Sequence, residues 1–296
     1  MDLSALQAFV AVAETGSFSR AGERLFLTQP AVSKRVAALE SELGARLLDR
    51  LARSVHPTEA GEALLPHAYR VLSELESSRQ AIADLAGTVA GRLRIGTSHH
   101  VGLHHLPPIL RDYSTRYPAV ELDLHFMDSE QACTAVDNGQ VELALVTLPA
   151  VASASLETET LWPDPLDFVT APGHPLAQSP TVQPEELAAW PAILPAPTTF
   201  TRRIVAEALR PREIQPRVAL ETNYLETIKM MVTVGLGWSA LPRTMNTGDL
   251  AVLELPGVQL ERRLGLIRRV GRTPGNAATA FAQTARRFAA DTILPH

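Results

Sequence analysis

The stretch Phe18–Leu43, FSRAGERLFLTQPAVSKRVAALESEL, decides how the N-terminal part of this 296-residue chain folds. It predicts a short helix, a tight turn over Phe26–Thr28 and a second, longer helix. In the second helix four apolar residues are spaced by four, three and four positions, which places them on one inward face. These residues are Val32, Val36, Leu39 and Leu43.

The second helix has a predicted beginning and a polar outer face. Thr28 is a suitable N-cap, because its hydroxyl can accept a hydrogen bond from a backbone N–H of the first turn. Pro30 then falls in that first turn, where its missing N–H costs little. The outer face offers an amide, a hydroxyl and cations, namely Gln29, Ser33 and Lys34, with Ala37 between them and Arg35 at the flank.

These groups are the ones that read base edges in a DNA major groove, where Gln binds adenine and Arg or Lys binds guanine. A solvated outer face on an ordinary helical hairpin gives the same pattern, so spacing alone leaves both interpretations open. The charge count adds a local signal. Seven basic and four acidic residues between Phe18 and His56 leave +3 on this segment, whereas the whole chain carries −5 with a pI of about 6.0.

The segment Leu3–Arg50 resembles the N-terminus of the LysR-type transcriptional regulators. The matching elements are Phe9, the Glu14–Phe18 turn, Ala21, Leu25, the Gln29-Pro30-Ala31-Val32-Ser33 core, Leu39-Glu40, Leu43-Gly44 and Leu47. The resemblance implies a winged helix-turn-helix domain over residues 1–57. The predicted DNA-binding residues are Arg20, Thr28, Gln29, Pro30, Ser33, Lys34, Arg35, Arg50 and Arg53.

The segment after Gly44 predicts a small hairpin or wing, in which Arg50 and Arg53 can meet phosphates or a minor groove. Solvated loop arginines are the alternative for each. Thr58 then caps a long helix that runs to about Leu85 and is kinked near Glu62 by Pro66. Apolar and small residues along it form the seam of a helix pair: Leu64, Ala68, Val71, Leu75, Ser78, Ile82 and Leu85. This seam predicts a dimer through a linker helix over residues 58–87.

Beyond the boundary at Gly87–Gly91 the pattern changes to strands that alternate with helices, which predicts parallel α/β structure. Expected strands are Arg92–Gly96, Val120–Phe126, Val141–Thr147, Leu166–Thr170, Ala192–Leu194, Val218–Glu221, Trp238–Leu241, Leu250–Leu255 and Arg263–Ile267. Expected helices are His100–Tyr117, Asp128–Gly139, Phe200–Leu209, Tyr224–Gly235 and Asn276–Thr292.

Two α/β lobes joined by crossing strands resemble the effector domain of the same family, which shares its architecture with periplasmic solute-binding proteins. The segments PGHPLA (172–177) and GLGWSALP (235–242) also look like parts of that domain. The predicted fold is therefore α+β multidomain, with an effector domain over residues 92–296. Lobe I is expected at about 92–161 and 268–296, and lobe II at about 162–267.

A ligand in such a domain binds where strands end and helices begin, because free N–H groups and the helix dipole favour an anion there. Three of these junctions carry hydroxyls, namely Thr97–His100, Thr147 and Thr198–Thr201. The third precedes a helix that carries Arg202 and Arg203. The resemblance implies that they face a cleft holding a small, anionic effector; ordinary helix capping is the alternative. The predicted effector-binding residues are Thr97, Ser98, His99, His100, Thr147, Thr198, Thr199 and Phe200.

Other chemistry is not indicated. Cys133 is the only cysteine, so an internal disulfide is excluded, and an apolar helical context favours a buried, unreactive thiol. In the cluster His99–His105, His100 and His104 are spaced as metal ligands on a helix, but no local carboxylate or thiol completes a site, so no metal is predicted. The Gly235–Gly237 segment is a weak dinucleotide signal that turn chemistry explains better.

No catalytic constellation, cofactor site or 18-residue apolar segment is evident, so we expect a cytoplasmic regulator that is not an enzyme and does not contact a membrane. The resemblance implies that it binds operator DNA and a small-molecule effector, forms dimers and tetramers, and contacts RNA polymerase. An alternative from another class is a cytosolic solute-binding protein that its N-terminal helices dimerise.

Overall fold

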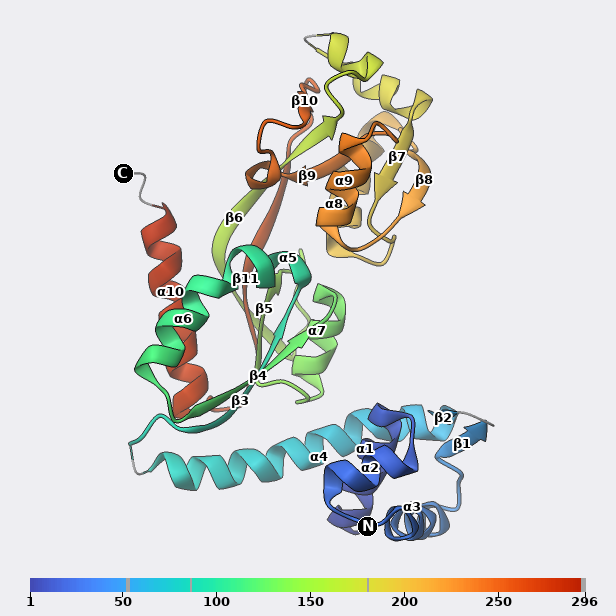
Figure 1. Cartoon of the computed structure of the whole chain (residues 1–296), viewed down its shortest axis with the longest axis vertical. Helices are drawn as coiled ribbons and strands as arrows, with labels where there is room; N and C mark the ends of the chain where they lie inside the picture. The colour runs from blue at the N-terminus through green and yellow to red at the C-terminus, as the bar shows by residue number, and fades with distance from the viewer. Residues whose placement is uncertain (52–53, 86, 180, 294–296) are drawn as a thin grey trace. The chain divides into compact units, whose positions relative to one another are not determined.

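The computed structural model describes residues 1–51, 54–85, 87–179 and 181–293, and the chain forms two compact units (Figure 1). Unit 1 comprises Met1–Thr88 with Asn138–Gln140, and unit 2 comprises Val89–Asp137 and Val141–His296. Each unit has its own apolar core. Among the described residues, no helix has both the length and the apolar character needed to cross a bilayer.

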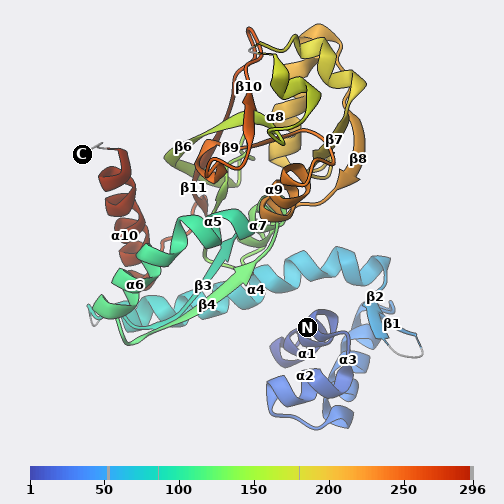
Figure 2. The ribbon, with the colours of Figure 1, turned by 45° about the horizontal axis from the view of Figure 1, so that its top comes forward.

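Unit 1 begins with three helices, α1 (Leu3–Thr15), α2 (Phe18–Leu25) and α3 (Gln29–Leu43), which Figure 2 shows packed together. This confirms the predicted helix-turn-helix. α1 contributes more to the core than a single stripe, because it packs against α2, α3 and α4 (Glu59–Asp84) at once. Ala5, Ala8 and Ala11 are therefore buried together with Leu6, Phe9 and Val10, whereas Ala13 is half-buried.

The inward face of α3 is confirmed at three of its four positions. Val32, Val36 and Leu39 are at most 1% exposed, whereas Leu43 is 44% exposed, so its predicted burial was wrong. Leu43 is the last residue of α3, directly before Gly44 ends the helix in a left-handed conformation (φ 65°). The buried face therefore stops one turn before the helix does.

Thr28 occupies the N-cap of α3 as predicted, but its hydroxyl makes no capping hydrogen bond. An N-cap oxygen accepts from the second or third residue of the helix. Pro30 in the second position has no N–H to give, which leaves only the N–H of Ala31 in the third, and the Thr28 hydroxyl does not accept from it. Pro30 does lie in the first turn, as the sequence predicted.

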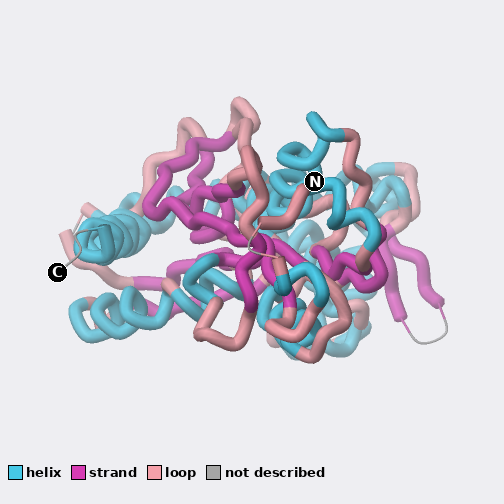
Figure 3. Tube along the Cα trace, turned by 90° about the horizontal axis from the view of Figure 1, so that it is seen from above, coloured by secondary structure: helices cyan, strands magenta, loops and turns pink. Residues whose placement is uncertain are grey.

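The wing is confirmed as a hairpin of β1 (Leu48–Leu51) and β2 (Ser54–Pro57), which pair antiparallel (Figure 3). The Glu40 carboxylate of α3 accepts hydrogen bonds from the backbone N–H groups of Leu47 (2.8 Å) and Leu48 (3.2 Å). These hydrogen bonds fix the start of the wing to α3, the helix that carries the predicted DNA-binding face.

α4 begins as predicted, since the Thr58 hydroxyl accepts a hydrogen bond from Gly61 N at 3.1 Å, and the helix continues through Pro66. The residues of its predicted seam differ in how far they are buried. Ala68 is buried in the core of unit 1, and Leu64 and Leu75 are half-buried. Val71 and Ile82 on α4, and Leu85 directly after its last residue, are 42%, 73% and 86% exposed. The seam from Val71 to Leu85 therefore shows apolar side chains that a single chain does not cover.

Unit 2 is built on a seven-stranded sheet with the order β10-β6-β11-β5-β3-β4, in which β9 also pairs with β6. Its strands are β3 (Gly91–Thr97), β4 (Val120–Phe126), β5 (Leu143–Thr147), β6 (Leu156–Thr170), β9 (Ser239–Pro242), β10 (Ala251–Leu253) and β11 (Leu260–Arg269). β3 pairs parallel with both β4 and β5, which confirms the predicted βαβαβ order.

Helices cover both faces of the parallel part of this sheet (Figure 1). α6 (Leu106–Arg116) and α10 (Asn276–Ile293) pack with Leu143 and Leu145 of β5, whereas α7 (Ser129–Asp137) packs with the alternate residues Ala144 and Val146. The single helix expected over His100–Tyr117 is divided into α5 (His99–His104) and α6. Prolines in the first turn of α6 lack the N–H groups that would continue α5.

Lobe II contains a separate parallel pair, β7 (Pro191–Leu194) and β8 (Arg217–Glu221), with α8 (Phe200–Leu209) and α9 (Leu225–Thr233). It does not repeat lobe I as the sequence suggested, because β9 and β10 pair antiparallel with β6. Short 3-10 helices lie at Pro175–Gln178, Pro184–Ala189, Arg210–Arg212 and Arg243–Met245.

The long strands β6 and β11 cross between the lobes and pair antiparallel, with a register shift between Leu264 and Gly265. A Cβ atom on Gly265 would lie 2.0 Å from the Glu159 carbonyl oxygen, so only glycine permits this close approach. The predicted joining of two lobes by crossing strands is confirmed.

A strained residue in unit 1 gives a test of the turn. Phe26 is 97% exposed and has φ 55°, a conformation that costs a bulky residue about 1 kcal/mol or more and that asparagine tolerates. We expect Phe26→Asn to raise the free energy of unfolding of unit 1 by about 1 kcal/mol. Amide hydrogen exchange of the α1 and α3 cores measures this. A loss of protection would show that the Phe26 side chain makes a stabilising contact that outweighs the strain.

Candidate DNA-binding face and effector cavity

The polar face of α3 begins at its N-terminal turn. Thr28, Gln29, Pro30 and Lys34 are exposed, and Ser33 and Arg35 are half-buried. Because Val32 and Val36 hold the opposite face in the core, these side chains project from a rigidly packed helix. An amide and an ammonium on such a turn have the donors and acceptors that a major groove recognises.

The arginines predicted to bind DNA differ in their surroundings. The Arg20 guanidinium donates a hydrogen bond to the Thr15 carbonyl at the corner between α1 and α2. Arg24, which was not assigned a role, forms an ion pair with Glu14 and so adds little to the local positive field. Arg53 lies outside the described residues. Arg50 lies in β1, and its side chain is outside what the structure describes.

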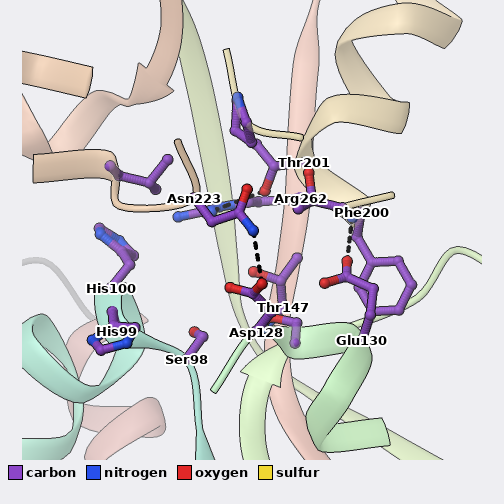
Figure 4. A pocket seen from close by; sticks show the side chains of 14 residues that line it. Ser98, His99, His100, Asp128, Glu130, Thr147, Phe200, Thr201, Asn223 and Arg262 are labelled. Atoms are coloured by element: carbon purple, nitrogen blue, oxygen red, sulfur yellow. Dashed lines mark hydrogen bonds between the residues drawn. The ribbon is translucent and has the colours of Figure 1, made fainter. Parts of the chain in front are cut away.

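Unit 2 contains a cavity of about 450 Å³, part of it open to solvent, between lobe I and lobe II (Figure 4). It brings together residues from all three predicted junctions, which lie far apart in the sequence. Those that line it are Ser98, His99, His100, Thr147, Thr199, Phe200 and Thr201. Thr198 is not among the lining residues. Thr97 is fully buried and donates a hydrogen bond to the Leu145 carbonyl at 2.9 Å, so its hydroxyl serves the sheet.

The predicted effector-binding residues include six of the fourteen that line the cavity. Those missed are Asp128, Ser129, Glu130, Pro195, Thr201, Asn223, Leu225 and Arg262. The Asp128–Glu130 segment follows β4 and begins α7, so the rule that selected the other strand-to-helix junctions would have found it. Arg262 lies inside β11, and no local signal in the sequence distinguishes it from the arginine that follows.

Two hydrogen bonds join the lobes across the cavity, as Figure 4 shows. Asn223 Nδ2 donates to Asp128 Oδ2 at 2.7 Å. The backbone N–H of Phe200, the first residue of α8, donates to the Glu130 carboxylate. A carboxylate from α7 therefore lies at the N-terminus of α8, where a helix favours negative charge. Burial raises the pKa of Glu130 above its usual value.

Thr199 is partly committed to capping. Its hydroxyl accepts a hydrogen bond from Arg202 N (3.2 Å) and donates one to the Ala196 carbonyl (2.9 Å). The helix-cap alternative therefore describes part of what Thr199 does. Ser98, in contrast, is the N-cap of α5 and makes no capping hydrogen bond with its side chain.

One residue of the cavity lining, Arg262, belongs to a buried ion pair. Arg262 and Asp164 side chains are 3% and 5% exposed, and Arg262 Nε donates to the Asp164 carboxylate. Arg262 Nη1 donates to the Thr201 hydroxyl at 3.2 Å, which links β11 to α8. Among the described residues, Arg262 Nη2 is buried without a hydrogen-bond partner. The cavity wall thus has a cationic donor available to a ligand.

His100 is a second residue of the cavity lining whose buried polar atoms lack hydrogen-bond partners among the described residues. It is 5% exposed, and neither ring nitrogen has a hydrogen-bond partner among the described residues. Burial, reinforced by the nearby Arg262 guanidinium, lowers the pKa of His100 to about 2, so the ring is neutral at physiological pH. Its 3.6 Å contact with Glu226 is therefore not an ion pair. His100, His104 and Glu226 are the described residues grouped closely enough to hold a metal ion.

Cys133 lies on α7, half-buried against the apolar cluster beneath that helix. Burial, with the neighbouring Glu130, raises the pKa of the thiol to about 11. The thiolate is the reactive form, so this cysteine is unreactive at neutral pH. It is less buried than the sequence predicted.

A helix-turn-helix unit on a chain with a cavity-bearing α/β unit defines a DNA-binding transcriptional regulator with an effector-binding domain. Two family models match the chain: bacterial regulatory helix-turn-helix protein, lysR family, over residues 3–62, and LysR substrate binding domain, over residues 86–290. The chain therefore belongs to the LysR family of transcriptional regulators, which decides against the solute-binding alternative. The family is one of transcription regulators and is not an enzyme class.

Individual relatives agree. A probable RuBisCO transcriptional regulator of Trichormus variabilis is 33% identical over 291 residues, which cover 95% of this chain and 86% of that protein. An uncharacterised helix-turn-helix regulator of Azotobacter vinelandii is 68% identical over 108 residues, covering 36% of this chain and 75% of that protein. Full-length OxyR from Pseudomonas aeruginosa has a similar structure, with a TM-score of 0.72, 25% identity and coverage of 97% of this chain and 95% of that one.

The buried ion pair in the cavity wall can be tested by mutation. We expect Asp164→Asn to lower the free energy of unfolding of unit 2 by about 3 kcal/mol, because the Arg262 charge stays buried without its counterion. All three tryptophans, Trp162, Trp190 and Trp238, lie in unit 2, so their fluorescence during urea denaturation reports on this unit.

Glu157→Gln is the matched control, because Glu157 is 60% exposed in its ion pair with Arg268. Glu157→Gln should lower the free energy of unfolding of unit 2 by less than about 1 kcal/mol. Adding Arg262→Met to Asp164→Asn should recover part of the loss, since the double variant buries no charge. If Asp164→Asn and Glu157→Gln lowered the free energy of unfolding equally, the stabilising role assigned to the Arg262–Asp164 pair would be contradicted.

Proposed function

We propose that the N-terminal turn of α3 reads the operator in the major groove. The observation that carries this proposal is the exposure of Gln29 and Lys34 on a helix whose other face is fixed in the core by Val32 and Val36. Gln29 contacts a base edge, Thr28, Ser33 and Lys34 contact bases or phosphates, and the wing arginines Arg50 and Arg53 contact the backbone or minor groove. Arg20 and Arg35 contribute from the flanks, and Pro30 sets the helix start.

Residues 1–57 then act as the DNA-binding domain and residues 58–87 as the dimerisation helix. Support comes from the apolar side chains of the seam from Val71 to Leu85, where Val71, Ile82 and Leu85 are exposed. A dimer presents two α3 helices to half-sites about 34 Å apart on one face of the duplex. Dimers pair further into tetramers through residues 92–296, and the assembly regulates transcription through RNA polymerase.

The cavity of unit 2 holds the effector. Support comes from Arg262, which lines the cavity and whose buried Nη2 has no hydrogen-bond partner among the described residues, and from the Ser98 hydroxyl at the N-terminus of α5. The effector is a small molecule with an anionic group. That group binds Arg262 and competes with Glu130 for the N-terminus of α8. Because Glu130 and Asn223 join the lobes, displacing Glu130 changes the contacts between them.

The DNA-reading role predicts a specificity loss. We expect Gln29→Ala to weaken binding to a specific operator by about 1–3 kcal/mol and to leave binding to random DNA unchanged, because a base contact is lost and phosphate contacts are kept. Titrations on both DNAs at one fixed salt concentration measure this. Gln7→Ala, at another exposed glutamine of unit 1, is the control. Equal losses on both DNAs would rule out base reading by Gln29.

The charge of the effector can be tested with the cavity carboxylate. A panel of small organic and inorganic anions is first screened for ligands that raise the melting temperature of unit 2; an anion at 100 times its Kd stabilises by about 2.7 kcal/mol. We expect Glu130→Gln to tighten the binding of that anion by about 10-fold or more, since unit charges about 8 Å apart interact by about 2 kcal/mol at an effective dielectric constant of about 20.

Glu185→Gln, which removes an exposed carboxylate from a 3-10 helix of lobe II, should leave the affinity unchanged. A cationic ligand should bind more weakly to the Glu130→Gln variant. If only cations stabilise the protein, and Glu130→Gln weakens them, the anionic class of effector is wrong while the location of the cavity stands.

A further inference from the structure

Two histidines and one glutamate meet where lobe I faces lobe II, next to the cavity. His100 and His104 lie four residues apart on α5, and their rings are 4.7 Å apart between centroids. Glu226 belongs to the first turn of α9, 122 residues after His104. One potential ligand atom from each of the three residues lies within 4.8 Å of the other two. A search of the local sequence could not find Glu226, because only folding brings α9 beside α5.

The spacing of the ligand atoms suits a metal ion. His104 Nε2 and Glu226 Oε1 are 3.0 Å apart, and His100 Nδ1 and Glu226 Oε1 are 3.6 Å apart. Ligand atoms on a tetrahedral ion with bonds of about 2.1 Å lie about 3.4 Å from each other. The two observed distances lie on either side of that value, and the nitrogens of the two histidines are at most 4.8 Å apart. Side-chain rotations that draw the three ligand atoms together would let them hold an ion.

The surroundings of His100 also favour ligation. Its ring is 5% exposed, and its Nδ1 lies 3.6 Å from the Glu226 carboxylate. Both of its ring nitrogens are buried without a hydrogen-bond partner in the part of the chain that the structure describes. A buried polar ring with no partner is costly unless something outside the protein satisfies it.

We propose that His100, His104 and Glu226 form a site for a divalent transition-metal ion of the zinc class. Two imidazoles and one carboxylate are three protein ligands, which leaves a fourth position for water or a ligand. The site joins α5 of lobe I to α9 of lobe II, so the bound ion holds the lobes together at this point. His100 also lines the cavity, so the ion places positive charge beside the cavity carboxylates Asp128 and Glu130.

A simpler arrangement is a hydrogen-bonded pair of His104 and Glu226 with no metal. That pair accounts for the 3.0 Å contact, but it leaves both nitrogens of His100 without a partner. The metal site gives His100 one, and the two arrangements differ in measurable ways.

The test uses the untagged full-length protein. Zn²⁺ is titrated in competition with a chromogenic chelator, and Co²⁺ is added separately to read coordination geometry from its visible absorption. We expect one Zn²⁺ per chain and a tetrahedral Co²⁺ spectrum. His104→Ala and Glu226→Gln should each weaken Zn²⁺ binding by more than about 10-fold and abolish that spectrum. His104 is 46% exposed, and Glu226→Gln preserves shape, so both variants should fold.

His125→Ala is the matched control, since the exposed His125 ring also contacts a carboxylate, Asp123, at 3.1 Å. It should keep the stoichiometry, the affinity and the Co²⁺ spectrum. Absence of stoichiometric Zn²⁺ binding would overturn the proposal. An octahedral Co²⁺ spectrum, or Zn²⁺ affinity that neither His104→Ala nor Glu226→Gln reduces, would overturn it equally. The result is independent of the effector, because no organic ligand is added.

Discussion

The antiparallel pairing of β6 with β11 is the constraint on which the ligand-binding half of the molecule depends. Both strands belong to both lobes, so the lobes share one continuous sheet. Gly265 permits the close approach to Glu159 at the register shift between them. β11 also carries Arg262, whose guanidinium reaches Asp164 on β6 and Thr201 on α8. The same pairing therefore holds the lobes together and fixes the cationic wall of the cavity.

The cavity is not a simple positive pocket. Its one arginine has a buried carboxylate partner, its buried histidine is neutral, and two carboxylates, Asp128 and Glu130, face the same space. Glu130 already occupies the end of α8 that attracts negative charge. An anion that binds at this end of α8, as proposed for the effector, competes with the protein's own carboxylate, and its binding is then coupled to rearrangement of the lobe contacts.

The sequence predicted most of the fold because the periodicity of apolar residues is a local signal. The alternation of strands and helices and the inward face at Val32, Val36 and Leu39 could be read from it directly. The failures have physical causes outside that signal. Pro30 removes a donor from the cap expected of Thr28, and burial of Leu43 depends on how far the core extends. Arg262, Asn223 and Glu226 join the cavity region only through pairing of distant strands and helices, which periodicity cannot show.

The exposed apolar side chains of the seam from Val71 to Leu85 have a genetic consequence. If chains pair through them, a copy with an intact α4 and a damaged α3 still associates with normal copies. Each mixed dimer then has one functional α3 helix, and it binds an operator of two half-sites too weakly to stay bound. An allele that alters only the polar face of α3 should therefore be dominant when it is co-expressed, whereas an allele that disrupts α4 should be recessive.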